Sequence, residues 1–275
     1  MDAEGCFSIY KVALKPSGRL VYQPRIVISS VDLPLIKWLV ATFGGFYTSH
    51  VPKKGRVWYQ WNRNGRKSAT EFLSDIIPYL RVKKQEALIL KKFYELKAYT
   101  CDESQGLMEG IRQLKDRECS TTETLDGSIT DKLTHAYLAG IFDGEGCISV
   151  GIAPSGKPVL HTQVGNNYKP LIEFLIKIYG GWFDSIPARG NSKESHRWNV
   201  TTKELREKFL SQILPYLRIK KEQAKLALHY IQLPKEGSRE ERVRIGSLIK
   251  ELNRPKIRPA LTSDRECASA EMLTA

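Results

Sequence analysis

The chain contains the same sequence twice, and this internal duplication is the feature that most limits its fold. DAEGCFSIYK, which begins at Asp2, matches DGEGCISVGI, which begins at Asp143. IIPYLRVKK, which ends at Lys84, matches ILPYLRIKK, which ends at Lys221. The offset between the copies is slightly smaller at the second match, so a few residues of loop differ between them. A duplication of this kind predicts two copies of one structural unit within a single chain.

Each copy predicts the same series of elements. Alternating apolar and polar residues predict strands, and a Pro-Ser-Gly turn predicts that the first two strands form a hairpin. A helix follows, with Pro34 or Pro170 in its first turn and a Gly-Gly pair at its end. In repeat 1 we expect strands at 6–12, 19–29, 45–50 and 57–62 and later helices at 68–77 and 83–97. The later elements of repeat 2 are expected as strands at 181–186 and 196–201 and helices at 203–213 and 220–231. This order predicts an α+β fold with mostly antiparallel sheets.

Changes in composition predict the domain boundaries. We expect repeat 1 at 1–99, a polar linker at 100–131 with one short helix at 107–115, repeat 2 at 132–233 and a C-terminal tail at 234–275. The tetrapeptide DREC occurs at 116–119 and again at 264–267, which suggests that the duplication extends into the linker and the tail.

Charge indicates the class of partner. The chain has 43 Lys and Arg against 30 Asp and Glu, a formal net charge of +13 and a pI near 9.5. This excess favours an extended polyanion, with nucleic acid as the first candidate. A membrane surface is the second candidate, but the sequence has no apolar run of bilayer length and no signal-peptide pattern, so no membrane partner is expected. We therefore expect an intracellular protein that is not secreted, in a compartment that the sequence does not specify.

The segment HAYLAGIFDGEG, from His135 to Gly146, combines two features that are unusual for a helix. Its small residues allow another helix backbone to approach closely, and its acids lie at the end where the helix dipole disfavours negative charge. Both features are explained if two such segments pack together and each delivers one acid, Glu4 or Glu145, to a shared divalent-metal site. For a motif that occurs only once, a solvated acid at a helix end would be the simpler explanation.

LAGIFDGEG resembles the LAGLIDADG signature of the homing endonucleases, and MDAEG at the start looks like the last part of a second signature. The resemblance covers both repeats. It implies two pseudo-twofold-related αββαββα units that form a DNA-binding saddle, and it implies a monomer that cuts double-stranded DNA at specific sites. It further implies Mg²⁺, or another divalent metal such as Mn²⁺, at Glu4 and Glu145, with Lys83 and Lys220 close to the scissile phosphates. Ser30 and Asn166 match positions that organise water in such enzymes.

Polar side chains along the expected strands are candidates for contacts with DNA, because Arg and Gln can read base edges and Lys mostly meets phosphate. The candidates are Lys11, Arg19, Tyr22, Gln23, Arg25, Arg56, Gln60, Arg63, Lys157, His161, Gln163, Arg189, Arg197 and Asn199. The copies differ most in these strands, so we expect a long target that is asymmetric or pseudo-palindromic. A solvated sheet face would account for part of this pattern.

Two other functions fit the same scaffold. An intron RNA maturase would need the basic face, and a DNA-binding protein that does not cut would not need the acids. Retention of both acids favours the nuclease. Met1 stands just before the acidic tripeptide of the first motif, so we expect either that this start is internal to a longer reading frame or that the contact between the repeats is built from one motif helix only. We therefore expect the motif helix of repeat 2 to expose an apolar face, including Leu138 and Ile141, that suits a partner helix.

Overall fold

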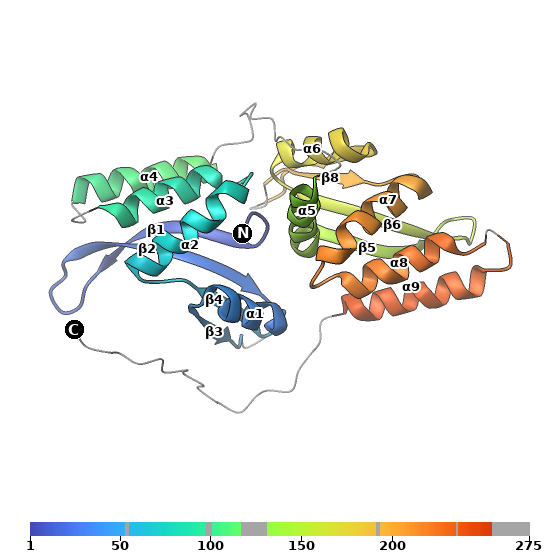
Figure 1. Ribbon diagram of the computed structural model, residues 1–275, viewed down its shortest axis with the longest axis horizontal. Coiled ribbons are helices and arrows are strands. Elements are labelled where there is room, and N and C mark those ends of the chain that lie inside the picture. Colours follow the sequence, from blue (N-terminus) through green and yellow to red (C-terminus); the bar gives the residue numbers. More distant parts are fainter. Residues whose placement is uncertain (53–54, 97–100, 117–130, 191–192, 235, 255–275) are drawn as a thin grey trace.

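The computed structural model describes residues 1–52, 55–96, 101–116, 131–190, 193–234 and 236–254. Within this part of the chain, each repeat is built on a four-stranded antiparallel sheet covered by helices (Figure 1). Repeat 1 contains β1 (Gly5–Ala13), β2 (Leu20–Ser30), α1 (Leu33–Phe43), β3 (Phe46–His50), β4 (Trp58–Asn62), α2 (Arg66–Ile76), a 3₁₀ turn (Ile77–Tyr79), α3 (Lys84–Glu95) and α4 (Cys101–Asp116). Repeat 2 contains α5 (Lys132–Glu145), β5 (Gly146–Ile152), β6 (Pro158–Asn166), α6 (Lys169–Tyr179), β7 (Trp182–Ile186), β8 (Ser195–Asn199), α7 (Lys203–Ile213), a 3₁₀ turn (Leu214–Tyr216), α8 (Lys221–Gln232) and α9 (Arg239–Asn253).

The two sheets have the same topology. Their strand orders are β1-β2-β4-β3 and β5-β6-β8-β7, and every strand pair is antiparallel. The α+β fold and the duplicated order of elements are therefore confirmed. No helix in the described ranges is long and apolar enough to cross a membrane.

The Gly-Gly pairs end α1 and α6 in the same way. Gly44 has a φ of 67°, and its N–H donates to the Val40 carbonyl oxygen at 2.8 Å. A methyl group on Gly45 would lie 2.4 Å from the Asn62 carbonyl oxygen, so only glycine fits there. The buried Trp61 indole donates to the Gly44 carbonyl at 2.8 Å, and Trp198 makes the same bond to Gly180. Each of these tryptophans fixes the end of a helix to its sheet.

Each sheet has one apolar face and one polar face. On the apolar face, residues such as Phe7, Ile26 and Trp61 join the helices in the hydrophobic core. Directly opposed residues of antiparallel strands share a face, so the pairing Ser8–Arg25 and Tyr10–Gln23 defines the other side. We call this side the polar face, and its main residues are Ser8, Tyr10, Gln23, Arg25, Ser29, Thr48, Gln60 and Asn62 in repeat 1 and Ser149, His161, Gln163, Asp184, Arg197 and Asn199 in repeat 2.

The segments expected as linker and tail each add a helix to a core. Helix α4 is longer than the expected helix at 107–115, and its buried Ile111 packs in the core of repeat 1. Helix α9 packs against β5 and α8, where Ile245 and Ile249 are buried. A methyl group on Gly246 would lie only 2.9 Å from the Val150 Cβ, which shows how closely α9 approaches the sheet. The repeat unit therefore extends one helix beyond each expected boundary, while both DREC segments reach outside the described residues.

Helix α5 buries its large apolar side chains in its own repeat. Leu138 and Ile141 belong to the core of repeat 2, contrary to the expectation that they face a partner helix. The helical period places Leu133, Ala136 and Gly140 on the exposed side instead, and Leu133 is 62% exposed. The apolar run of the motif is therefore explained by packing within one repeat.

Two arginines cross between the repeats at equivalent positions. The Arg218 guanidinium lies 3.7 Å from the ring centroid of Trp38 in α1. The Arg81 guanidinium lies 5.1 Å from the ring of Phe174 in α6 and 5.0 Å from that of Tyr137. Arg81 aligns with Arg218, and Trp38 aligns with Phe174. We call these two contacts the arginine clamps, and they relate the repeats by a pseudo-twofold axis.

Candidate functional site

The two predicted acids converge at the contact between the repeats, which we call the seam. Glu145 is the last residue of α5, and Glu4 lies in the turn before β1. A methyl group on Gly144 would lie 2.5 Å from the Ala3 Cβ and 3.6 Å from a carboxylate oxygen of Glu4. Only glycine allows the end of α5 to approach the turn of repeat 1 this closely. The structure thus brings together acids that are far apart in the sequence.

The electrostatic environment of Glu145 agrees with this proximity. Burial raises the pKa of Glu145 above its ordinary value, and the negative charge of Glu4 raises it further. The positive charges of Lys83 and Lys220 act in the opposite direction. Two carboxylates held near each other form a site where a bound cation would relieve repulsion.

The donor set fits one type of metal better than another. Among the described residues there is no group of three or more His, Cys, Asp or Glu side chains that could enclose a metal ion. Zinc sites usually require such a set, whereas Mg²⁺ is often held by one or two carboxylates together with water and phosphate oxygens. Glu4 and Glu145 therefore suit a hard divalent cation that completes its coordination with water or phosphate oxygens.

The two predicted lysines lie beside the acids. The Lys83 ammonium donates to the carbonyl oxygens of Ala3 at 3.0 Å and Gly5 at 2.7 Å. These acceptors are the residues directly before and after Glu4. The Lys220 ammonium donates to the Asp143 carbonyl oxygen in the equivalent turn. Burial lowers the pKa of both lysines, while nearby carboxylates, Glu145 among them, oppose this shift. The structure places Lys83 and Lys220 next to the turns that carry the acids.

Sequence reasoning missed the role of the first acid in each motif. The Asp2 carboxylate accepts the backbone N–H groups of Arg81, Val82 and Lys83 at 2.8–3.0 Å. It also accepts the Tyr137 hydroxyl of repeat 2 at 3.0 Å. This hydroxyl has its pKa raised well above the ordinary value, first by burial and then by the Asp2 charge.

Asp143 makes the equivalent contacts in repeat 2. Its carboxylate accepts the backbone N–H groups of Arg218, Ile219 and Lys220 at 2.8–3.1 Å. Each aspartate therefore fixes the residues that precede a helix and orients the lysine of the site. The repeated D-x-E-G spacing was the signal in the sequence that could have separated the two acids by role.

Half of the predicted DNA-binding residues lie on the polar faces. Gln23, Arg25 and Gln60 do so in repeat 1, and His161, Gln163, Arg197 and Asn199 do so in repeat 2. The Arg25 guanidinium donates to the Gln60 side chain, which in turn donates to the Ser29 hydroxyl at 3.2 Å. Four further candidates are exposed residues of turns and loops, namely Arg19, Arg56, Lys157 and Arg189.

Three predicted residues lie on the helix-covered side instead. Tyr22 is only 4% exposed, and its hydroxyl donates to Gln105 of α4 at 3.2 Å. Lys11 is directly opposed to Tyr22 across the β1–β2 pair, with its ammonium 5.7 Å from that ring. Arg63 donates from Nε to the Ser68 carbonyl at 3.2 Å, where α2 begins. Strand alternation, which composition alone does not reveal, puts these side chains on the opposite face.

The predicted water-organising residues hold turns. The Ser30 hydroxyl accepts the Asp32 N–H at 3.1 Å, and the Asn166 side-chain oxygen accepts the Tyr168 N–H at 2.7 Å. The two residues are equivalent, and each shapes the turn that leads into α1 or α6. Their role toward water stays a prediction.

Comparison with known proteins supports the fold. No protein-family model matches the sequence, and no curated protein matches it. Among solved structures, the meganuclease I-SmaMI bound to uncleaveable DNA matches with a TM-score of 0.65 and 19% identity, over 90% of this chain and 92% of that chain. The LAGLIDADG homing endonuclease I-GzeII in complex with its DNA target matches with a TM-score of 0.65 and 16% identity, over 90% of this chain and 94% of that chain. I-SmaMI bound to cleaved DNA matches with a TM-score of 0.63 and 19% identity, over 92% and 95% of the two chains. The duplicated ββαββ order of elements, the contact between the repeats and these likenesses show that the chain has the LAGLIDADG homing endonuclease fold.

Proposed function

We propose that the chain is a site-specific endonuclease that hydrolyses phosphodiester bonds of double-stranded DNA with a divalent metal. The observation that carries this proposal is the convergence of Glu4 and Glu145 at the seam, with Lys83 and Lys220 beside them. A DNA-binding scaffold alone has no need to bring two acids together, because acids repel the phosphate backbone. The DNA-bound states of I-GzeII and I-SmaMI, which share this fold, support the same substrate class.

The chemistry follows from the charges at the seam. Glu4 and Glu145 would hold Mg²⁺ or Mn²⁺, and such a metal would supply Lewis-acid chemistry that polarises a phosphoryl oxygen and activates water. Lys83 and Lys220 would stabilise the negative charge that develops on the phosphate. Asp2 and Asp143 would keep these lysines in place through the backbone that they bind. The pseudo-twofold arrangement supplies one lysine to each side of the acid pair, which suits attack on both DNA strands.

The polar faces indicate an asymmetric target. Equivalent positions carry Thr48 and Asp184, Gln60 and Arg197, and Val27 and Gln163. Two faces with such different donors and acceptors would read different base pairs. Because one chain contains both halves of the acid pair, we propose that it acts as a monomer on a long target that is not a perfect inverted repeat.

Cleavage of a random library of double-stranded DNA in Mg²⁺, followed by sequencing of the cut ends, tests this proposal without a known target. We expect one family of sequences to be cut. We expect Glu145→Gln to reduce cleavage of the selected site by at least about a hundredfold, because loss of one electrostatic group at a reaction centre has effects of roughly 10²–10³. Binding of the same DNA in a gel-shift assay should remain.

The control is Glu222→Gln, which removes an exposed acid in the first turn of α8 that pairs with Lys225. It should leave cleavage unchanged. If Glu145→Gln abolishes binding together with cleavage, Glu145 is structural. If the wild-type chain selects DNA but never cuts it, the protein is a DNA-binding protein only. Stronger binding to intron RNA than to any selected DNA would favour a maturase.

A further inference from the structure

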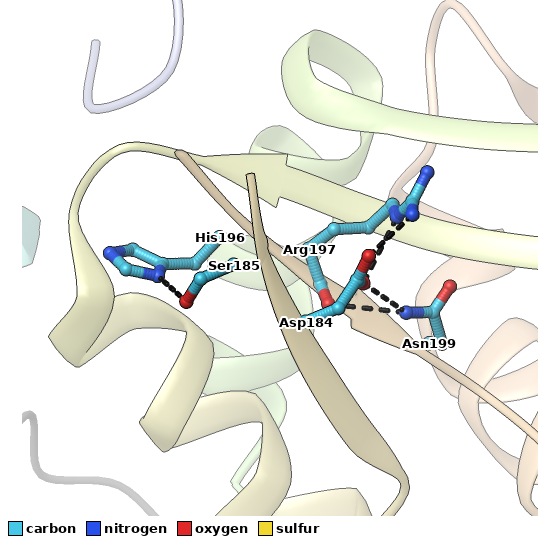
Figure 2. Close-up of polar contacts among 5 residues, drawn as sticks. All are labelled: Asp184, Ser185, His196, Arg197 and Asn199. Carbon is cyan, nitrogen blue, oxygen red and sulfur yellow. Dashed lines mark hydrogen bonds and ion pairs between the residues drawn. The ribbon is translucent and has the colours of Figure 1, made fainter. Parts of the chain in front are cut away.

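An acid and an arginine form a closed pair on the polar face of repeat 2 (Figure 2). The Arg197 Nε donates to Asp184 Oδ1 at 3.1 Å, and Arg197 Nη2 donates to Asp184 Oδ2 at 2.5 Å. Asn199 Nδ2 donates to the same Oδ1 at 3.0 Å. Asp184 and Arg197 are directly opposed on β7 and β8, so the backbone register itself holds the two side chains together. We call these three residues the polar-face triad.

The triad is built more firmly than an ordinary surface ion pair. Its contact is bidentate, and Asn199 adds a third donor to the carboxylate. The Arg197 guanidinium, through its hydrogen bonds, holds the pKa of Asp184 below its usual range. Asn199 is itself tied back, because its amide also donates to the Arg197 carbonyl at 3.2 Å. The arginine therefore has one favoured orientation instead of many.

The geometry leaves one edge of the guanidinium available. Asp184 occupies the side edge formed by Nε and Nη2, and the Arg197 side chain is 38% exposed. Within the described residues, no other side chain or backbone group accepts from Arg197. The remaining end edge, formed by Nη1 and Nη2, carries two parallel N–H groups. That spacing matches the O6 and N7 acceptors of guanine in the major groove.

Repeat 1 has no such pair at the equivalent positions, both of which are described. Thr48 stands in place of Asp184 and Gln60 in place of Arg197. There the arginine comes from the neighbouring strand, as Arg25, and is held by the neutral Gln60. The fold does not require the acid at this position, since repeat 1 forms the same sheet without it. The triad is therefore a feature of one half of the polar surface.

We propose that Asp184 is a positioning residue that holds Arg197 in the orientation needed to read one guanine in the DNA half-site bound by repeat 2. The inference rests on the proposed function, because it names a recognition element for the same substrate. Direct reading of cytosine by Asp184 is the competing role. Both carboxylate oxygens are already engaged by Arg197 and Asn199, which favours positioning.

Selection of bound sequences from a random library of double-stranded DNA tests this role, with base preference at each position as the readout. We expect the wild-type chain to enrich guanine at one position of one half-site. Asp184→Ala and Asp184→Asn should each weaken this preference by about tenfold, within the range that one bidentate arginine–guanine contact contributes. Arg197→Ala should weaken the same position, and Asp184→Ala combined with Arg197→Ala should weaken it no further. The preferences at the other positions should stay as they are.

The matched control is Glu241→Gln, which breaks a bidentate pair with Arg244 on α9. It should leave every base preference unchanged, and thermal unfolding of each variant verifies that the chain still folds. If Asp184→Ala changes no base preference, or instead removes a preference for cytosine, positioning by Asp184 is overturned while the DNA-binding function stands. If the wild-type chain enriches no sequence at all, the proposed function fails and the inference fails with it.

Discussion

Replacing Asp2 by Asn tests whether the first acid of each motif stabilises the fold through its hydrogen bonds. The Asp2 side chain is 6% exposed and accepts three backbone N–H groups and the Tyr137 hydroxyl. An amide has the same shape but carries no charge, and its NH₂ group would face a donor at one of these contacts. The variant therefore separates charge and hydrogen bonding from packing.

The magnitude follows from the number of bonds affected. A hydrogen bond to a charged group contributes about 1.5–3 kcal/mol, and a buried donor left unpaired costs about 1–3 kcal/mol. We expect Asp2→Asn to lower the free energy of unfolding by about 2–4 kcal/mol, since one donor loses its acceptor and the other bonds lose their charge. Asp143 is more exposed and lacks a tyrosine partner among the described residues. Asp143→Asn should therefore lower the free energy of unfolding by only about 1–2 kcal/mol.

Urea unfolding at neutral pH, followed by tryptophan fluorescence, measures both values. Asp75→Asn serves as the control, because Asp75 is exposed on α2, and it should stay within about 0.5 kcal/mol of the wild type. DNA cleavage by Asp2→Asn should also fall, since Lys83 loses the bond that holds its backbone. The structural role of these aspartates is wrong if Asp2→Asn is no less stable than Asp75→Asn. It is also wrong if Asp143→Asn lowers the free energy of unfolding more than Asp2→Asn does.

The remaining predictions concern the seam and the polar faces. In a double-mutant cycle of Arg218→Ala and Trp38→Ala, we expect a coupling free energy of about 1 kcal/mol, because cation–π contacts at exposed to partly desolvated sites range from about 0.5 to 2 kcal/mol. Purely additive effects on the unfolding midpoint would show that the arginine clamp contributes nothing. We also expect DNA affinity, measured by fluorescence anisotropy, to fall steeply as salt rises, because a chain of net charge +13 displaces counterions from DNA. An affinity that is flat between low and moderate salt would contradict nucleic acid as the partner.

Much of the fold could be predicted because the turns are specified by local chemistry. Pro34 marks the start of α1 and Gly44 and Gly45 mark its end, and Pro170, Gly180 and Gly181 do the same for α6. The extent of α4 and α9 could not be predicted in the same way. Their apolar contacts are few, such as Ile111 and Ile249, so the sequence around them is typical of a linker. Packing against a finished sheet is what stabilises these helices.

The candidate site shows a similar limit. The pairing of Glu4 with Glu145 followed from the duplication, since equivalent residues of two related units meet at their axis. The face of a strand residue did not follow, because a shift of one position moves a side chain to the other side of the sheet. Tyr22 and Gln23 are neighbours in the sequence, yet one lies in the core and the other on the polar face. Asp184 was missed because a carboxylate in a strand of basic and amide side chains has a clear role only when its partner is visible.

The arginine clamps have a consequence for how such a chain could have arisen. Each clamp joins an arginine of one repeat to an aromatic ring of the other, so repeat 1 contributes Arg81 and Trp38, and repeat 2 contributes Arg218 and Phe174. Each repeat therefore contributes one arginine and one aromatic ring to the contact. Such reciprocity is the property of a self-complementary, isologous interface. Two identical ancestral subunits would already have closed both clamps before any gene fusion. Separate changes to the two polar faces would leave both clamps in place, because none of the four clamp residues lies on a polar face.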